Sequence, residues 1–476
     1  MRFETHLSLR IVACLSAACL LVGCRSSDAR ARAALSAYQT ATASDDLAGE
    51  RRALLQLVQA KDDVPDYWVE LGKLEAFTGS YSDAYYAFSR AYELDRSNVE
   101  VLRAVTQLAL RAGDLPSAMS HAQELEVLSP GDPWPKLTKG WSSISELHFD
   151  EALTAADAIL ANSPYDPSAT ALKARALIGL KREDDARNLL VKQTEAQPGD
   201  VGSLELLAQI YDREDNWPNL LAVAQRLNQR SPANPKNALN VIEAGLRSGN
   251  IEVARAASRR LLSTGAPPAL VNSVLELWEE YWPSQQRIDD ARSLAAQATS
   301  LQSRLAYASF LSRVGSPADA VRLSSSAATL PVNAANAEAN AVLGDALATI
   351  GNTGPAKSRL DAVIAFDPGN ATALRARAEL ELRIGQPKAA VVDAEKLATV
   401  LPNSAKDRLL LARTYQAEGN SAWVNRTLWS AFQDIPANER LFAALQATRK
   451  GDADATRELQ EEFDHQRDAI LARGLI

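Results

Sequence analysis

The sequence predicts an all-α protein, an α-solenoid (superhelix) of about twelve helix–turn–helix repeats that share a 34-residue period. The first observation is composition: alanine and leucine dominate the 476 residues, and both lose little entropy in a helix. The second is that proline, alanine and glycine all recur at this period. The third is that no stretch rich in glycine or serine interrupts the pattern, so nothing indicates a separately folded catalytic domain.

Prolines mark the end of each repeat. They form two sets in which each proline follows the last by one period, and the gap between the sets equals four periods. We expect each proline to end the second helix of a repeat, because it lacks the amide hydrogen that a helix interior needs. An aspartate or asparagine two positions later suits the N-cap of the next helix. The prolines are Pro130, Pro164, Pro198 and Pro232, then Pro368, Pro402 and Pro436, and the cap residues are Asp132, Asp166, Asp200 and Asn234.

Alanines mark the second helix of each repeat. A small side chain there lets two helices approach to the lower end of the usual range of about 8–10 Å. A bulkier residue would overpack the contact, at a cost of about 1–3 kcal/mol. Between Ala254 and Ala356 the register is less regular, although the three uneven intervals still amount to three periods. The markers are Ala84, Ala118, Ala152, Ala186, Ala254, Ala291, Ala320, Ala356 and Ala390.

Glycines follow the same period at the end of the first helix. A glycine adopts the left-handed C-cap conformation without a penalty from Cβ. We therefore expect a tight turn between the two helices of a repeat at each of these positions. They are Gly79, Gly113, Gly249, Gly351, Gly385 and Gly419.

The best-defined repeat, residues 65–98, identifies the type of repeat. It carries Trp68, Leu71, Gly72, Ala84 and Phe88 at the spacing W-x₂-L-G…A-x₃-F. In this it closely resembles the tetratricopeptide repeat (TPR), which has the same period. Two positions depart from the pattern, since a glutamate and an arginine stand where the repeat has tyrosine and proline; they are Glu75 and Arg96. The resemblance implies helical hairpins stacked into one extended solenoid with a concave groove.

The N-terminal segment is typical of a secretory signal. Arg2 and Arg10 precede an apolar stretch from Ile11 to Val22 that is too short to span a bilayer. The stretch ends in Leu-Val-Gly-Cys, which resembles the lipobox of bacterial lipoproteins, so we expect Cys24 to be acylated. Such acylation anchors a protein stably to a membrane. Because Arg25 rather than aspartate follows the cysteine, the resemblance implies the periplasmic face of the outer membrane.

These observations divide the chain into seven segments. Both ends of the repeat array depart from the pattern, as capping repeats with a polar outer face do. Residues 1–23 are expected to be a lipoprotein signal peptide, 24–30 a lipid-anchored linker, 31–64 a degenerate N-terminal capping repeat, 65–268 a regular array, 269–336 irregular units, 337–438 a regular array and 439–476 C-terminal capping helices.

The irregular units contain the most aromatic stretch of the chain, from Leu277 to Pro283. Two interpretations are open. The stretch is either a hinge between two sub-solenoids or an irregular repeat with bulky packing.

Composition and motifs exclude several functions. The net charge of −8 leaves no basic surplus for phosphate backbones, so we expect no nucleic-acid partner. No phosphate loop, nucleophile elbow or zinc-binding helix motif occurs. The four histidines lie far apart, and we expect no metal site, no cofactor and no catalytic residue. The protein is therefore not expected to be an enzyme.

The resemblance to TPR proteins also implies where a partner binds. Their partners are protein or peptide segments, held along the groove that the first helices line. Arginine recurs at the thirteenth position of the repeat, where it could bind carboxylates bidentately. The alternative is a purely structural role, because a cation near a helix C-terminus is favoured by the helix dipole. The candidate groove residues are Arg111, Trp141, Arg175, Arg213, Arg247 and Arg383, with Lys73, Phe77, Gln107, Gln209, Glu243, Glu379 and Arg413 at equivalent positions.

Taken together, the sequence favours a non-catalytic protein-interaction scaffold. By resemblance it would be an outer-membrane lipoprotein that assists assembly of an envelope export or secretion machine, of the exopolysaccharide, pilus or secretin type. A carbohydrate- or peptidoglycan-binding module is the alternative, with the arginines and Trp141 contacting a glycan.

Overall fold

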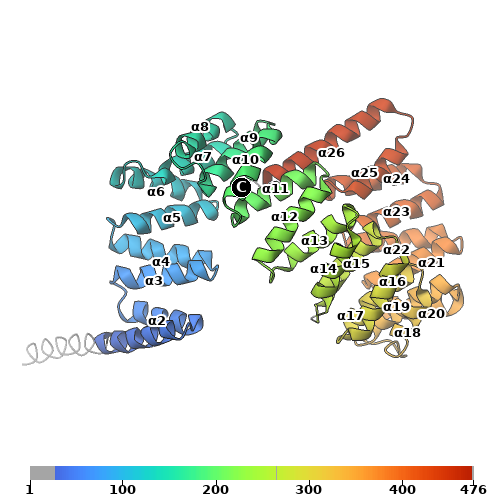
Figure 1. Ribbon diagram of the computed structural model, residues 1–476. Coiled ribbons are helices and arrows are strands. Elements are labelled where there is room, and N and C mark those ends of the chain that lie inside the picture. Colours follow the sequence, from blue (N-terminus) through green and yellow to red (C-terminus); the bar gives the residue numbers. More distant parts are fainter. Residues whose placement is uncertain (1–26, 264, 474–476) are drawn as a thin grey trace, which may run out of the picture. The chain divides into compact units, whose positions relative to one another are not determined.

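The computed structural model describes residues 27–263 and 265–473, with side chains described as far as residue 467. Every regular element in this part of the chain is helical (Figure 1). The predicted signal peptide and Cys24 lie outside the described residues. The predicted all-α solenoid of helical hairpins is confirmed, with twelve hairpins before α25 and a thirteenth formed by α25 and α26.

The chain divides into two compact units after Pro198. The first described helical stretch of unit 1 spans residues 27–43 and so includes residues 27–30 of the expected lipid-anchored linker. An ion pair of 2.5 Å between Asp28 and Lys61 ties the start of this stretch to the end of the next helix. The further helices of unit 1 are α2 (Leu47–Ala60), α3 (Pro65–Phe77), α4 (Tyr81–Leu94), α5 (Val99–Arg111), α6 (Leu115–Leu128), α7 (Pro133–Ser145), α8 (Phe149–Leu160), α9 (Pro167–Gly179) and α10 (Glu183–Ala196).

Unit 2 continues the same pattern to the end of the described chain. Its helices are α11 (Val201–Arg213), α12 (Trp217–Arg230), α13 (Pro235–Arg247), α14 (Ile251–Leu262), α15 (Pro268–Tyr281), α16 (Gln285–Gln297), α17 (Leu301–Arg313), α18 (Pro317–Ser324), α19 (Ala337–Ile350), α20 (Thr353–Phe366), α21 (Ala371–Arg383), α22 (Pro387–Val400), α23 (Ala405–Glu418), α24 (Ser421–Asp434), α25 (Glu439–Thr448) and α26 (Ala453–Arg473).

Each unit has two layers of helices. Within a hairpin the first and second helices pack against each other, and first helices such as α5, α7 and α9 also contact one another. The core lies between the layers, where the alanine markers are fully buried. Close approach also explains Gly72, because a Cβ there would lie 2.9 Å from the ring of Phe88 on the paired helix. The zero-exposure alanines are Ala84, Ala118, Ala152, Ala186, Ala254, Ala291, Ala320, Ala356 and Ala390.

The turns follow from the residues that stand in them. Asp166, for example, accepts a hydrogen bond of 2.8 Å from the backbone N–H of Ala169 and so caps α9. The equivalent Asp132, Asp200 and Asn234 cap their own helices in the same way. Such caps start many of the first helices at the same place in the repeat, which helps to keep the hairpins at a constant chain length.

The aromatic stretch of the irregular units lies in the core of unit 2. Trp278 is fully buried, and its indole N–H donates a 3.1 Å hydrogen bond to the hydroxyl of Ser258 on α14. Its ring meets those of Trp282 and Phe310 edge-on, at centroid distances of 5.2 and 6.2 Å. The stretch therefore packs α15 against α14 and α17, and the division into two units falls elsewhere, between Pro198 and Gly199.

Candidate functional site

The first helices of unit 1 and the start of the second helix α4 present residues that we call the unit 1 face. They are Phe77, Tyr81, Arg111, Trp141 and Arg175. These residues come from the C-terminal ends of α3 and α5, from the start of α4, and from α7 and α9. Large aromatic side chains and arginines therefore recur along one layer of the unit. This composition is the one that dominates binding energy at protein interfaces.

Phe77 is the most exposed aromatic residue of this face. It is the last residue of α3, and 77% of it is accessible to solvent. Its neighbour Lys73, one turn earlier, pairs with Glu70 at 2.7 Å and also remains exposed. A partner protein that covers an exposed phenylalanine gains binding free energy, because apolar surface is removed from water.

Arg111 and Tyr81 form an exposed cation–π pair in the same face. The guanidinium carbon lies 3.7 Å from the centroid of the tyrosine ring. Such a pair is worth about 0.5–1 kcal/mol at an exposed site, and it fixes the orientation of a long side chain. The planar guanidinium is thereby held in place for a carboxylate ligand.

Trp141 of α7 and Arg175 of α9 form a second cation–π contact further along the unit. The guanidinium carbon of Arg175 lies 5.3 Å from the ring centroid of Trp141, and both residues are half-buried. The structure thus brings together two of the predicted groove residues of unit 1, Trp141 and Arg175, and places a third, Arg111, against the ring of Tyr81.

In unit 2 the corresponding arginine is enclosed. Arg247 lies between the rings of Trp217 and Tyr281, at 3.6 and 4.8 Å from their centroids. Its Nη2 donates to Glu439 at 2.8 Å and its Nη1 donates to the hydroxyl of Tyr281 at 3.2 Å. Burial, with the nearby Glu280 carboxylate, raises the pKa of the Tyr281 hydroxyl, which stays protonated. Only 15% of the Arg247 side chain is exposed.

Glu439 belongs to the C-terminal hairpin, the name used below for α25 and α26. A second contact of this hairpin joins Arg440 to Glu280 of α15 at 2.9 Å. A third is made by Arg467, whose Nη2 donates to the backbone carbonyls of Asp212 and Arg213 at the end of α11, at 3.3 and 2.8 Å. Figure 1 shows α26 beside α11 within unit 2. The hairpin therefore lies on the first helices of its own unit.

This arrangement differs from the open row of arginines that the sequence predicts. Arg247 binds a carboxylate of the chain itself, and the backbone of Arg213 receives the Arg467 side chain. Arg383 at the end of α21 is exposed and lies 3.7 Å from Glu379 on its own helix, a contact that the helix geometry provides. The predicted groove arginines thus fall into different environments, packed on single aromatic rings in unit 1 and covered by the C-terminal hairpin at α11 and α13.

Residues of α25 and of the first helices line an open cavity of about 880 Å³ in unit 2. Glu279 accepts from Arg313 at 2.9 Å and lies 3.6 Å from Lys406. Burial opposes ionisation of Glu279, but Arg313 and Lys406 outweigh it and lower the pKa of this carboxyl. The cavity lining carries equal numbers of acidic and basic residues, namely Glu276, Glu279, Glu280, Glu338 and Glu439 against Arg247, Arg313, Arg375, Lys406 and Arg440.

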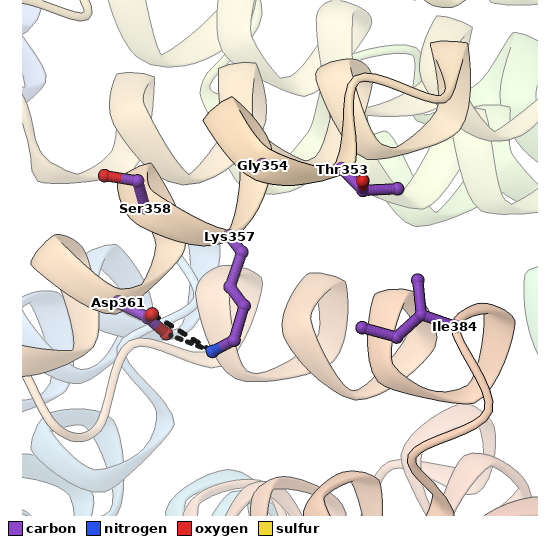
Figure 2. Close-up of a pocket in the computed structure, with 6 residues that line it drawn as sticks. All are labelled: Thr353, Gly354, Lys357, Ser358, Asp361 and Ile384. Carbon is purple, nitrogen blue, oxygen red and sulfur yellow. Dashed lines mark hydrogen bonds and ion pairs between the residues drawn. The ribbon is translucent and has the colours of Figure 1, made fainter.

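A shallower cavity of about 430 Å³ lies over α20 and the end of α21 (Figure 2). Figure 2 shows the Lys357 ammonium directed at the Asp361 carboxylate, at 3.0 and 3.2 Å from its two oxygens. Asp361 also accepts from Arg377, which forms two further hydrogen bonds to the buried Asp393. The charged residues that line this cavity, Lys357 and Asp361, are therefore already paired with each other.

Two further properties of the described part of the chain limit its chemistry. No group of three or more histidine, cysteine, aspartate or glutamate side chains is arranged to hold a metal ion there. Within the same residues, no helix combines the length and the apolar character needed to cross a membrane.

Several of these residues were not predicted from the sequence. Tyr81 stands as far before Arg111 as Trp217 stands before Arg247, so a search for aromatic residues at a constant interval before the arginines would have found both pairs. Glu439 and Arg467 carry no such signal, because their contacts join residues 192 and 254 positions apart.

Comparisons with known proteins give partial matches. A family model described as the N-terminal TPR repeats region of Psidin matches residues 136–263. A search of the curated proteins finds no match. Among solved structures, the chain is similar to a tetratricopeptide repeat protein from Parabacteroides merdae, with 15% identity over 53% of this chain and 99% of that one and a TM-score of 0.39.

Two further solved structures are similar to the chain. Yeast Tom70 is 12% identical over 83% of this chain and 97% of its own, with a TM-score of 0.28. YrrB, described as a TPR protein with an unusual peptide-binding site, is 15% identical over 35% of this chain and 87% of its own, with a TM-score of 0.29. The helical hairpins define the class of the protein as an α-solenoid, and the family model matches its residues 136–263 to TPR repeats. A TPR scaffold of this kind suggests a role in protein–protein interaction.

Proposed function

We propose that this chain is a non-catalytic scaffold of the cell envelope that holds a segment of a partner protein on the unit 1 face. Two observations on neighbouring repeats carry the proposal: Phe77 is exposed at the end of α3, and the guanidinium of Arg111 at the end of α5 is fixed on the ring of Tyr81. A segment with an apolar side chain next to a carboxylate complements these two groups. In unit 2 the equivalent arginine already has a carboxylate, which supports unit 1 as the open surface.

The test is site-specific crosslinking of the full chain in its native cells. A photo-reactive amino acid at position 77 is expected to give a discrete adduct with a partner protein, and Arg111→Glu should weaken that adduct severalfold. The matched control is the same amino acid at Val127 on α6, a second-helix residue that is 79% exposed. Equal adducts from both positions would show that the unit 1 face is not selective.

We further propose that the scaffold is lipid-anchored through Cys24 at the periplasmic face of the outer membrane and assists assembly of an export or secretion machine. The support is the lipobox-like Leu-Val-Gly-Cys sequence and the arginine that follows it. Cys24→Ser is expected to release the protein into the soluble periplasmic fraction, because the acyl chains supply the membrane affinity. Retention in the membrane fraction would contradict the anchor. Adducts at position 77 with glycan alone would favour the carbohydrate-binding alternative.

A further inference from the structure

We infer that unit 2 carries a second binding face for a protein segment, and that the C-terminal hairpin occupies this face as an internal ligand with which a partner exchanges. The inference rests on the proposed scaffold function, because it assigns a partner chemistry to the same molecule. The unit 2 face is defined by the C-terminus of α11, by Trp217 and Arg247, and by Glu280 and Tyr281.

The hairpin meets this face through polar groups. Glu439 reaches Arg247, Arg440 reaches Glu280, and Arg467 reaches the last carbonyls of α11. A cation is favoured at those carbonyls, because the C-terminus of a helix carries a partial negative charge. Three contacts, one from an acidic and two from basic side chains of the hairpin, therefore set how the hairpin is seated.

The apolar anchorage of the hairpin comes from its own helices and from α23 and α24, although Phe463 also borders the pocket over α11 and α13. Phe463 of α26 stacks on Phe442 of α25 at 4.4 Å, and Leu459 is fully buried in the same cluster. This cluster is formed by residues of α23 to α26, and its described members include none from α11 to α15. Opening the polar contacts therefore leaves the apolar core of the hairpin intact. Because each repeat of a solenoid packs mainly on its neighbours, such opening needs only a small change in every repeat.

The chemistry of the occupied face identifies the partner. Arg247 is fixed between two aromatic rings and presents its guanidinium to a carboxylate, while Glu280 accepts a cation next to it. A polyanion would meet repulsion at Glu280, and a polycation would meet it at Arg247. The face therefore fits a polypeptide segment in which an acidic residue is followed by arginine or lysine, as in the pair of the hairpin itself.

The test uses a synthetic fluorescent peptide of residues 435–467 and the purified full chain. The variant Arg440→Glu/Arg467→Glu weakens the seating from the hairpin side and leaves the face unchanged. The double variant is expected to bind the peptide at least about tenfold tighter than the wild-type chain. In the wild-type chain the hairpin covers the face most of the time, and only the small open fraction can bind the peptide. The matched control is Arg457→Glu on the exposed side of α26, where Arg457 pairs with Asp454 and Glu461 of its own helix. Equal binding by all three chains, or no binding by the double variant, would overturn the inference.

A charge-exchange experiment keeps the inference testable if the double variant is poorly folded. The chain with Glu280→Arg should prefer a peptide carrying Arg440→Glu over the wild-type peptide by about tenfold. Equal affinity for the two peptides would show that this contact does not select the occupant. Neither peptide experiment involves Phe77 or a natural partner, so negative results in both would not affect the proposal for unit 1. Likewise, a negative crosslinking result at position 77 would not affect the inference for unit 2.

Discussion

In the turn between the two helices of a repeat, one residue has a left-handed backbone whether or not it is glycine. The predicted glycines Gly79 and Gly113 have φ of 84° and 75°. In the next three repeats the same position is held by Leu147, Lys181 and Asp215, with φ of 63°, 59° and 52°. A left-handed conformation costs a residue with a Cβ about 1–2 kcal/mol. The packing of the hairpin therefore imposes the left-handed turn, and glycine occupies this position in only some of the repeats.

Lys181→Gly is expected to stabilise unit 1 by up to about 1 kcal/mol, because relief of the left-handed strain exceeds the entropy that glycine loses on folding. Gly113→Ala should destabilise it by about 1 kcal/mol. No atom lies within 4 Å of a Cβ built at Gly113, so the effect there comes from the backbone alone. Urea unfolding followed by far-UV circular dichroism measures both changes. Effects of the same sign would contradict the strain argument.

Residues whose environment is set by their own hairpin were the predictable ones. The buried position of Ala84 and the left-handed φ of Gly113 follow from contacts within one repeat, which the period records. The environment of Arg247 was not predictable, because its carboxylate partner lies 192 positions away and repeats no pattern. The period also says nothing about Glu75, a departure from the repeat pattern that is buried and accepts from Arg51 at 2.6 Å.

Among the elements, the irregular helices of unit 2 are joined by charged contacts as well as by aromatic packing. Asp319, in the first turn of the short helix α18, accepts from Arg292 of α16 at 2.5 Å. Burial would raise the pKa of Asp319, but hydrogen bonds from Ser316, Arg292 and Arg322 outweigh it and lower the pKa to about 2. The existence of these helices was predictable from the alanine spacing. The contact between Arg292 and Asp319 was not predictable, because the repeat register does not say which charged side chains meet.

The pKa of Asp319 gives a prediction for acid stability. A carboxyl whose pKa is lower in the folded state stabilises the fold above its unfolded pKa, and this contribution is lost as pH falls through the folded value. The wild-type chain should therefore lose stability relative to Asp319→Asn between about pH 4 and about pH 2. Asp289→Asn is the matched control, since Asp289 binds the same arginine from an exposed position. Urea midpoints measured across this pH range test it, and parallel curves for wild type and Asp319→Asn would contradict it.

At the scale of the molecule, the division into two compact units falls after Pro198, within the stretch 65–268 for which the sequence predicts a regular array. The marker residues continue through this point without change, with Pro198 and Asp200 in their expected places. The division therefore depends on features of packing that the repeat pattern does not encode. In a solenoid, stability is approximately a sum of repeat and nearest-neighbour terms, so two compact units can differ in stability.

This leads us to expect that the two units unfold independently. Ala152→Leu in α8 places a larger side chain at a fully buried position and should destabilise unit 1 by about 1–3 kcal/mol. Ala158→Leu, at an exposed position of the same helix, is the matched control and should have little effect. Hydrogen exchange resolved by segment in increasing urea should show α3 to α10 losing protection earlier in Ala152→Leu, while α11 to α26 keep the wild-type midpoint. Because distant, independent sites contribute additively, a matching shift in unit 2 would mean that the whole chain unfolds as one cooperative block.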